Sequence, residues 1–300
     1  MDALMILGAL VAPLLYAFTN HIDNFMLSKH EGSVLTWWII SLLVSAVPAA
    51  VIWVCVPTVL DMPWAHIGVM FVNGLLNTTL LWLYLTAMDE DEPTATITFY
   101  QLVPFFGLVL GYVFLSETFG WVELAGGALV IAVTAGMVVS GSSFALRLRT
   151  IMFMSAASFC WAGETTITKW IALEEGLWEA LFWENLAMFC YGLLALLLPA
   201  VRQSVKQVLD QPGSILTWSG VNEGIYIVGN VFATLMVTLV PVAMNLLFNT
   251  FQTFFVLGIG LAIAYFKPGY ETGLNKETVW KYIACIMITA VGVYLIGEWE

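Results

Sequence analysis

The sequence predicts an all-α integral membrane protein with ten transmembrane helices, arranged as two inverted five-helix repeats. Of the 300 residues, 61% are hydrophobic and only 10% are charged, and the mean hydropathy is +0.91. This composition is far more apolar than that of a soluble domain. The apolar residues form continuous runs of about 20, the length that crosses a bilayer as a helix. The two halves of the chain also carry similar residues in the same order.

Turn and loop signals between the apolar runs set the expected helix ends. Examples are the QPGS segment at Gln211 and the KPGY segment at Lys267. Strands of a β-barrel are shorter and alternate in polarity, so these continuous runs favour helices. The first run has no basic segment before it, so we expect a retained helix and no cleaved signal. The expected helices cover residues 4–26, 35–56, 67–88, 94–115, 121–139, 151–173, 177–201, 215–238, 242–266 and 279–296.

The two sets of five helices look like copies of one another. Three pairs in matching places are Tyr16 with Trp161, Asn73 with Asn222, and Phe99 with Phe248. The shared order of these pairs indicates an internal duplication. A unit with an odd number of helices enters the bilayer from the opposite side when it is repeated, which relates the halves by a pseudo-two-fold axis in the membrane plane. We therefore expect residues 1–142 to form the first repeat and residues 150–300 the second, inverted one.

The most specific motif runs from the fourth expected helix into the fifth. The segment QLVPFFGLVLGYVFLSETFGWVELAGGALVIAVTAG contains a proline, several small residues, a Leu-x-Glu ending and a glycine-rich following helix. These residues are Pro104, Gly107, Gly111, Leu115, Glu117, Gly126, Gly127 and Gly136. We expect Glu117 to cap the turn between the two helices.

Together with SFCWAGETTITKW at residues 158–170, this segment resembles the ten-helix EamA type of the drug/metabolite transporter superfamily. The resemblance covers nearly the whole chain. It implies a membrane transporter whose cavity is lined by the first, third, fourth, sixth, eighth and ninth helices. The chain departs from the family pattern at Asn24, where a lysine is common, and at Phe266, where the Leu-x-Glu ending is missing.

Polar residues inside the apolar runs are the main functional signal. A charged side chain at the bilayer centre costs at least about 2.5–3.5 kcal/mol, so such residues usually face a cavity, a partner or a water path. Spacings of three and four place the polar residues of several helices on one face each, and lipid cannot satisfy them. The predicted substrate-binding or coupling residues are Asn20, Asp23, Asn73, Asn77, Tyr100, Gln101, Trp161, Glu164, Lys169, Glu223, Tyr226, Asn230, Asn245 and Asn249.

Most of these residues have a structural alternative. The asparagines are equally well explained by hydrogen bonds between helices, which are worth about 0.6 kcal/mol on average. Asp23 and Lys169 lie near helix ends, where a side chain can extend to the interface. Glu184 is either interfacial or part of a structural pair. Glu164 and Glu223 lie deepest in their runs, and for these two we favour a functional role.

The composition also argues against other classes of protein. The net charge of −12 and a pI near 4.5, with no clustered Lys or Arg, argue against a nucleic-acid partner. The sequence shows no nucleotide-binding loop, no cluster of metal ligands and no nucleophile next to a base. We therefore expect no catalytic residues, no metal and no cofactor, and the protein is not expected to be an enzyme.

These observations predict a secondary transporter, not driven directly by ATP, that moves a small metabolite or drug-like solute by alternating access. Proton coupling is one option, because a carboxylate removed from water holds a proton more readily. The excess of acids over Lys169 favours a cationic or zwitterionic solute. A channel and a non-transporting receptor or scaffold are the alternatives. We expect a multi-pass protein of the cell (inner or plasma) membrane, monomeric or homodimeric, whose partners are the bilayer, the solute and, with coupling, protons.

Two arguments disagree on orientation. Eight of the nine basic residues flank the connections that follow odd-numbered helices: Lys29, Arg147, Arg149, Arg202, Lys206, Lys267, Lys276 and Lys281. The positive-inside rule makes these connections cytoplasmic and places both termini outside. Members of the family that the chain resembles tend to have both termini inside. We follow the charge count, and a cytoplasm-dependent reporter fused to Glu300 tests it.

Overall fold

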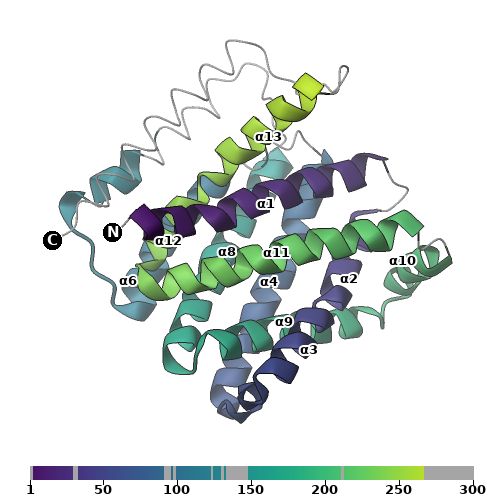
Figure 1. Cartoon of the computed structure of the whole chain (residues 1–300), viewed down its shortest axis with the longest axis horizontal. Helices are drawn as coiled ribbons and strands as arrows, with labels where there is room; N and C mark the ends of the chain where they lie inside the picture. The colour runs from purple at the N-terminus through teal and green to yellow at the C-terminus, as the bar shows by residue number, and fades with distance from the viewer. Residues whose placement is uncertain are drawn as a thin grey trace.

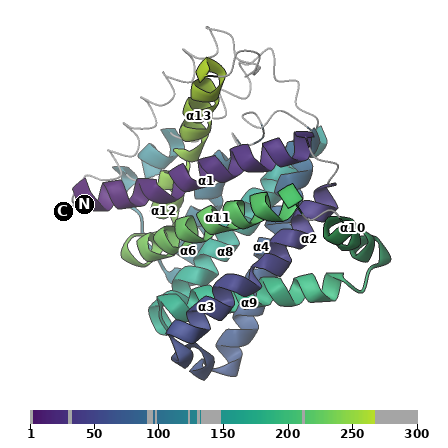
Figure 2. The same cartoon turned by 45° about the vertical axis from the view of Figure 1, so that its right-hand side comes forward.

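The structure is a computed structural model that describes residues 3–29, 33–90, 96, 99–122, 124–129, 132, 148–210 and 213–266. The elements assigned within these ranges are all helical. Four long helices of 27 residues each form the body of the molecule: α1 (Ala3–Lys29), α4 (Trp64–Glu90), α8 (Leu148–Glu174) and α11 (Gly213–Leu239). Helices α1 and α11 lie side by side in both views (Figures 1 and 2), and α4 packs along α8.

Within the described residues, five helical segments are long and apolar enough to cross a membrane. A sixth is added if the bent pair α9 (Leu177–Ala195) and α10 (Pro199–Asp210) is one span. This part of the sequence prediction is therefore confirmed as an all-helical fold with several candidate spans. The count of ten spans and the inverted repeat stay predictions. The expected helix over 279–296 and most of that over 121–139 lie outside the described residues.

The run predicted as one helix over 35–56 is two helices, α2 (Val34–Val44) and α3 (Ala46–Cys55), followed by the short 3₁₀ helix η1 (Pro57–Asp61). Pro48 has no backbone N–H, so it cannot complete the helical hydrogen bond to the carbonyl four residues earlier. At the break, the Ser45 hydroxyl donates to the carbonyls of Leu42, at 2.6 Å, and of Asn185 in α9, at 3.0 Å. The break therefore also ties α2 to α9.

The predicted helix over 177–201 ends too late. Helix α9 stops at Ala195, and the chain turns by 104° into α10. The apolar run continues through Leu196–Leu198, but Pro199 starts a new helix, because the fixed φ of proline suits the first turn of a helix. Helix α10 is amphipathic: Val201, Ser204 and Val208 are buried, while Arg202 and Lys206 are exposed.

Two further expected helices are also divided. The fourth consists of the 3₁₀ turn η2 (Phe99–Leu102) and α6 (Val103–Leu115). The ninth consists of α12 (Val242–Asn249) and α13 (Gln252–Phe266), with Thr250 and Phe251 between them. These breaks lie next to polar residues of the interior, so they position those side chains.

Small residues bring the helices close together in the core. Ala17 in α1, Ala87 in α4 and Ala162 in α8 are completely buried in one central cluster. Gly74 of α4 faces α9 so closely that a Cβ at this position would lie 2.5 Å from the Cβ of Ala187. Close backbone approach of this kind is typical of helix packing in membranes, where association depends on contact and not on expulsion of water.

Candidate functional site

A polar cavity of about 120 Å³ lies where the long helices cross. A single water needs roughly 10–15 Å³ on this measure, so the cavity has room for several waters or a small solute. Its lining residues before position 142 are Tyr16, Thr19, Asn20, Asp23, Trp37, Ser41, Asn77, Leu80, Leu81, Tyr84, Leu85 and Tyr100. Those after position 150 are Trp161, Glu164, Thr165, Thr168, Met188, Asn222, Glu223, Tyr226, Asn230, Ala233, Thr234, Val237, Asn245, Asn249 and Gln252.

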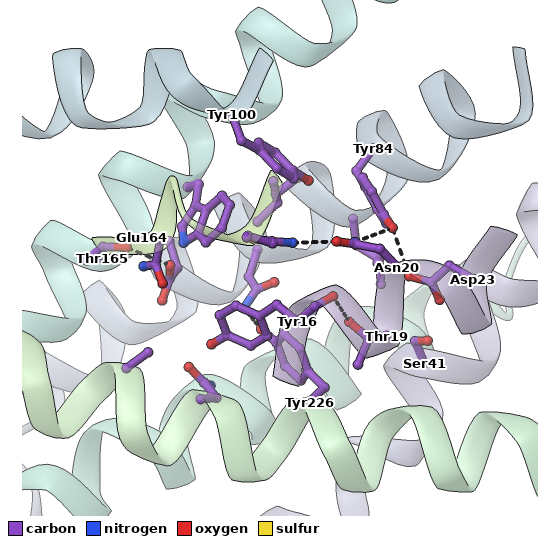
Figure 3. Close-up of a pocket in the computed structure, with 18 of the residues that line it drawn as sticks. Tyr16, Thr19, Asn20, Asp23, Ser41, Tyr84, Tyr100, Glu164, Thr165 and Tyr226 are labelled. Atoms are coloured by element: carbon purple, nitrogen blue, oxygen red, sulfur yellow. Dashed lines mark hydrogen bonds between the residues drawn. The ribbon is translucent and has the colours of Figure 1, made fainter. Parts of the chain in front are cut away.

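One end of the cavity is organised around Asp23 of α1 (Figure 3). Its carboxyl oxygens accept hydrogen bonds from the Tyr84 hydroxyl, at 3.0 Å, and from the Asn222 amide, at 2.8 Å. The Asn20 amide donates to the same Tyr84 oxygen at 2.7 Å. The Gln252 amide in turn donates to the Asn20 carbonyl oxygen at 2.6 Å. This chain of bonds joins α1, α4, α11 and α13, so it orients the carboxyl group relative to four helices.

The other end is organised around Glu164 of α8. Its two carboxyl oxygens accept from the hydroxyls of Thr165, at 3.2 Å, and Thr168, at 3.1 Å, both on the same helix. Asn73 of α4 donates to Thr168 Oγ1 at 2.7 Å and lies behind this group. The side chain of Glu164 is buried, with 7% of its surface exposed. A buried carboxyl group held by local hydroxyls is typical of a binding or coupling position.

Glu184 of α9 lies close to this end and is almost completely buried. Its Oε1 atom accepts from the amides of Asn77, at 2.9 Å, and Asn230, at 3.1 Å. Within the described part of the chain, its Oε2 atom has no hydrogen-bond partner. The Asn77 amide also donates a longer hydrogen bond, of 3.4 Å, to the Tyr226 hydroxyl. Glu184 is therefore a structural partner of two lining asparagines.

Aromatic rings form the walls between the two ends (Figure 3). The ring of Tyr100 packs edge-on against Trp161, with centroids 4.7 Å apart, and stacks with Tyr84 at 6.0 Å. On the other side, Tyr16 contacts Trp161 at 6.2 Å and Tyr226 at 5.6 Å. The middle of the cavity is thus an aromatic passage between two carboxyl groups.

Lys169 lies outside the cavity. Its ammonium group donates to Glu117 Oε1 and to the Val240 carbonyl, both at 2.7 Å. The Glu117 carboxyl oxygens also accept the backbone N–H of Val242, the first residue of α12, at 3.0 and 3.1 Å. The expectation that Glu117 caps its own turn is thus replaced by a longer-range role, because Glu117 caps α12 and neutralises Lys169.

The predicted site residues separate into three groups. Those that line the cavity are Asn20, Asp23, Asn77, Tyr100, Trp161, Glu164, Glu223, Tyr226, Asn230, Asn245 and Asn249. Asn73 and Lys169 are buried but do not line it. The side chain of Gln101 lies outside the described part of the structure.

Sequence reasoning missed the contribution of α2. Trp37 and Ser41 of this helix line the cavity, as Glu223 does. Ser41 is a single hydroxyl in an apolar run, which is a weak signal for a site residue. Trp37 is a tryptophan near the end of an apolar run, which is typical of an anchor at the membrane interface. Tyr16, Tyr84 and Gln252 were visible as members of the polar stripes, because each has the helical spacing from a predicted residue.

The lining is acidic and contains no basic side chain among the residues described. Asp23, Glu164 and Glu223 face the cavity, and the nearest buried cation, Lys169, is neutralised by Glu117. Within the same part of the chain, no three His, Cys, Asp or Glu side chains are placed to hold a metal ion. The arrangement is therefore suited to binding an uncharged or cationic solute through carboxyl, amide, hydroxyl and aromatic groups.

Comparisons with known proteins give a family match and a shared fold. Residues 3–139 match the EamA-like transporter family. Comparison with curated proteins gives no significant match. One solved crystal structure covers 99% of this chain and 99% of its own length, with a TM-score of 0.67 and 17% sequence identity. At this identity the match shows that the fold is shared and nothing more.

Proposed function

We propose that this multi-pass membrane protein, whose residues 3–139 match the EamA-like transporter family, is a secondary transporter that carries a small solute by alternating access. The proposal depends on one observation above all. A polar cavity lies inside an apolar helical molecule, and both halves of the chain contribute its walls. Such a site accepts a solute and shields it from lipid, whereas a receptor or scaffold does not require it.

The proposed duplication is supported by the helix bounds. Moving the bounds of α1 by 145 residues gives those of α8, since 3 and 29 become 148 and 174. Moving those of α4 by 149 gives those of α11, since 64 and 90 become 213 and 239. A shift of 149 residues also relates the first residue of α6, Val103, to the first residue of α13, Gln252. The division of the fourth and ninth expected helices is therefore repeated as well.

Equivalent residues also meet in the cavity, as a two-fold relation requires near its axis. Tyr16 and Trp161 are equivalent under the first shift, and their rings are in contact. Asn77 and Tyr226 are equivalent under the second, and they are hydrogen-bond partners. These contacts support an axis through the cavity, around which the two halves would rock to expose the solute to one side at a time.

Proton coupling is the finer part of the proposal. Glu164 on α8 and Glu223 on α11 both line the cavity. Replacing either by Gln should abolish transport driven by a pH gradient while exchange without a gradient continues. Equal pH dependence in the wild type and both variants would remove these residues from the coupling step.

Counterflow in proteoliposomes tests the transport function. Purified protein would be reconstituted and assayed with radiolabelled amino acids, nucleosides and amines, each on the opposite side from excess unlabelled solute. A carrier accumulates label transiently and saturates, whereas a channel does neither. Ala233→Trp should block the cavity, and Val228→Trp on the exposed face of the same helix should not. Absence of saturable exchange for the whole panel would favour a channel or receptor.

A further inference from the structure

We infer that the cavity binds a short linear organic dication, that is, a diamine with one ammonium group at each end. As an inference about the transported solute, it rests on the proposed transport function. Four carboxyl groups are arranged as two pairs, of which Asp23, Glu223 and Glu164 line the cavity, while Glu184 is buried outside its lining. Asp23 and Glu223 interact at one end, and Glu164 and Glu184 interact at the other. Asp23 and Glu164 lie on opposite sides of the aromatic walls (Figure 3). A solute with two positive groups places one of them at each pair.

On two helices, groups that belong to the two ends of the cavity lie seven residues apart. On α4, Asn77 bonds to Glu184 at one end and Tyr84 bonds to Asp23 at the other, seven residues along. On α11, Asn230 and Glu223 are also seven residues apart. Seven residues of α-helix span about 10.5 Å. If this rise is taken as the separation of the two ends, a charge-assisted hydrogen bond of about 2.8 Å at each end leaves about 5 Å between the two nitrogens, the reach of a three- or four-carbon diamine.

Unpartnered acceptors in the lining point to the same chemistry. Gln252 is 3% exposed, and its Oε1 atom has no hydrogen-bond partner among the described residues. Asn222 Oδ1, beside Asp23, is unpartnered too. Among the fully enclosed polar atoms of the described lining, these two acceptors compare with one unpartnered donor, Trp37 Nε1. Ammonium groups donate hydrogen bonds and accept none, so they satisfy such a lining better than a carboxylate or a phosphate does.

The walls suit the connecting chain. Tyr16, Tyr100, Trp161 and Tyr226 surround the passage between the two ends. Aromatic faces accept methylene groups and attract nearby cations. No basic side chain of the described lining competes for the carboxyl groups, because Lys169 is held by Glu117. Charge, spacing and hydrogen-bonding capacity thus agree on one class of solute.

Isothermal titration of the detergent-solubilised protein tests this assignment without requiring transport. The probes are 1,4-diaminobutane, n-butylamine with the same carbon chain and one amine, and glutarate as an anion. We expect the diamine to bind at least about tenfold more tightly than butylamine, because the second ammonium adds a charge-assisted contact. Glutarate should not bind.

The variants Asp23→Asn and Glu164→Gln should each reduce diamine affinity to the butylamine level while butylamine, bound at the intact end, changes little. Glu223→Gln is an independent change at the Asp23 end. Matched controls are Asp61→Asn and Glu174→Gln, the second on the same helix as Glu164, since both side chains are exposed. These controls should keep wild-type affinity.

The outcomes separate the two proposals. Equal affinity for diamine and butylamine, or a diamine preference that survives both Asp23→Asn and Glu164→Gln, overturns the dication assignment. Counterflow of some other solute by a protein that does not bind diamines leaves the transport function standing and removes this inference. Diamine binding with no exchange in proteoliposomes keeps the binding site and removes the transport function.

Discussion

The buried ion pair between Lys169 and Glu117 permits a quantitative test of how the two halves are joined. The side chains are 11% and 10% exposed, and the pair connects α8 to the turn after α6 and to the start of α12. Replacing Lys169 by Met leaves the Glu117 carboxylate buried with only a backbone N–H as its partner. Breaking a buried pair by removing one member costs about 3–5 kcal/mol. Glu117→Gln should cost a similar amount, because Lys169 then keeps only the Val240 carbonyl.

The double variant Lys169→Met with Glu117→Gln should be more stable than either single variant. It contains neither charge, and the amide oxygen of the new Gln still accepts the Val242 N–H. The remaining loss is mainly the hydrogen bond to the Val240 carbonyl, about 1 kcal/mol. The free energies of unfolding would be measured by reversible denaturation in mixed micelles, followed by circular dichroism. Additive losses, with the double variant at about 6–10 kcal/mol, would refute the coupling between these two side chains.

Three further variants test other contacts. Gly74→Ala should destabilise the protein by about 1–3 kcal/mol, because its Cβ would collide with Ala187, whereas Gly68→Ala on the same helix meets nothing within 4 Å and should be neutral or slightly stabilising in a thermal melt. Asn73→Ala should lower the unfolding free energy by about 1 kcal/mol with unchanged solute affinity in titration, since Asn73 lies behind the lining; a tenfold weaker affinity would contradict this. Trp161→Ala should weaken cation binding about 30-fold, the equivalent of about 2 kcal/mol for a desolvated cation–π contact, and Trp161→Phe should weaken it less.

Hydropathy predicted the long helices well, and their breaks poorly. The ends of α1 and α8 lie within a few residues of the predicted ones, because polar segments bound an apolar run on both sides. The break at Ser45 depends on the missing N–H of Pro48 and on a hydrogen bond to α9, and neither changes the mean hydropathy. The turn at Leu196–Leu198 is itself apolar, so a prediction from apolar runs continued through it.

Helical periodicity predicted most of the cavity, yet it could not separate neighbouring turns of one stripe. Asn73 and Asn77 are four residues apart on one face of α4. The structure places Asn77 in the lining and Asn73 against Thr168, because α8 packs directly over the earlier turn. Likewise, Lys169 continues the polar stripe of Glu164, but the Glu117 carboxyl group draws it out of the cavity. Such distinctions depend on partners from distant segments, which a single helix does not reveal.

The sharp turn between α9 and α10 indicates how α9 is positioned in the bilayer. An amphipathic helix turned by 104° from its neighbour would lie in the plane of the headgroups, with Arg202 and Lys206 toward water. Helix α9 has 19 residues, about 28 Å, which is close to the hydrocarbon thickness of about 30 Å. Glu184, seven residues from one end of α9 and eleven from the other, then sits about 10 Å and about 16 Å from the two surfaces. Anything that reaches its carboxyl group from water must travel through the protein.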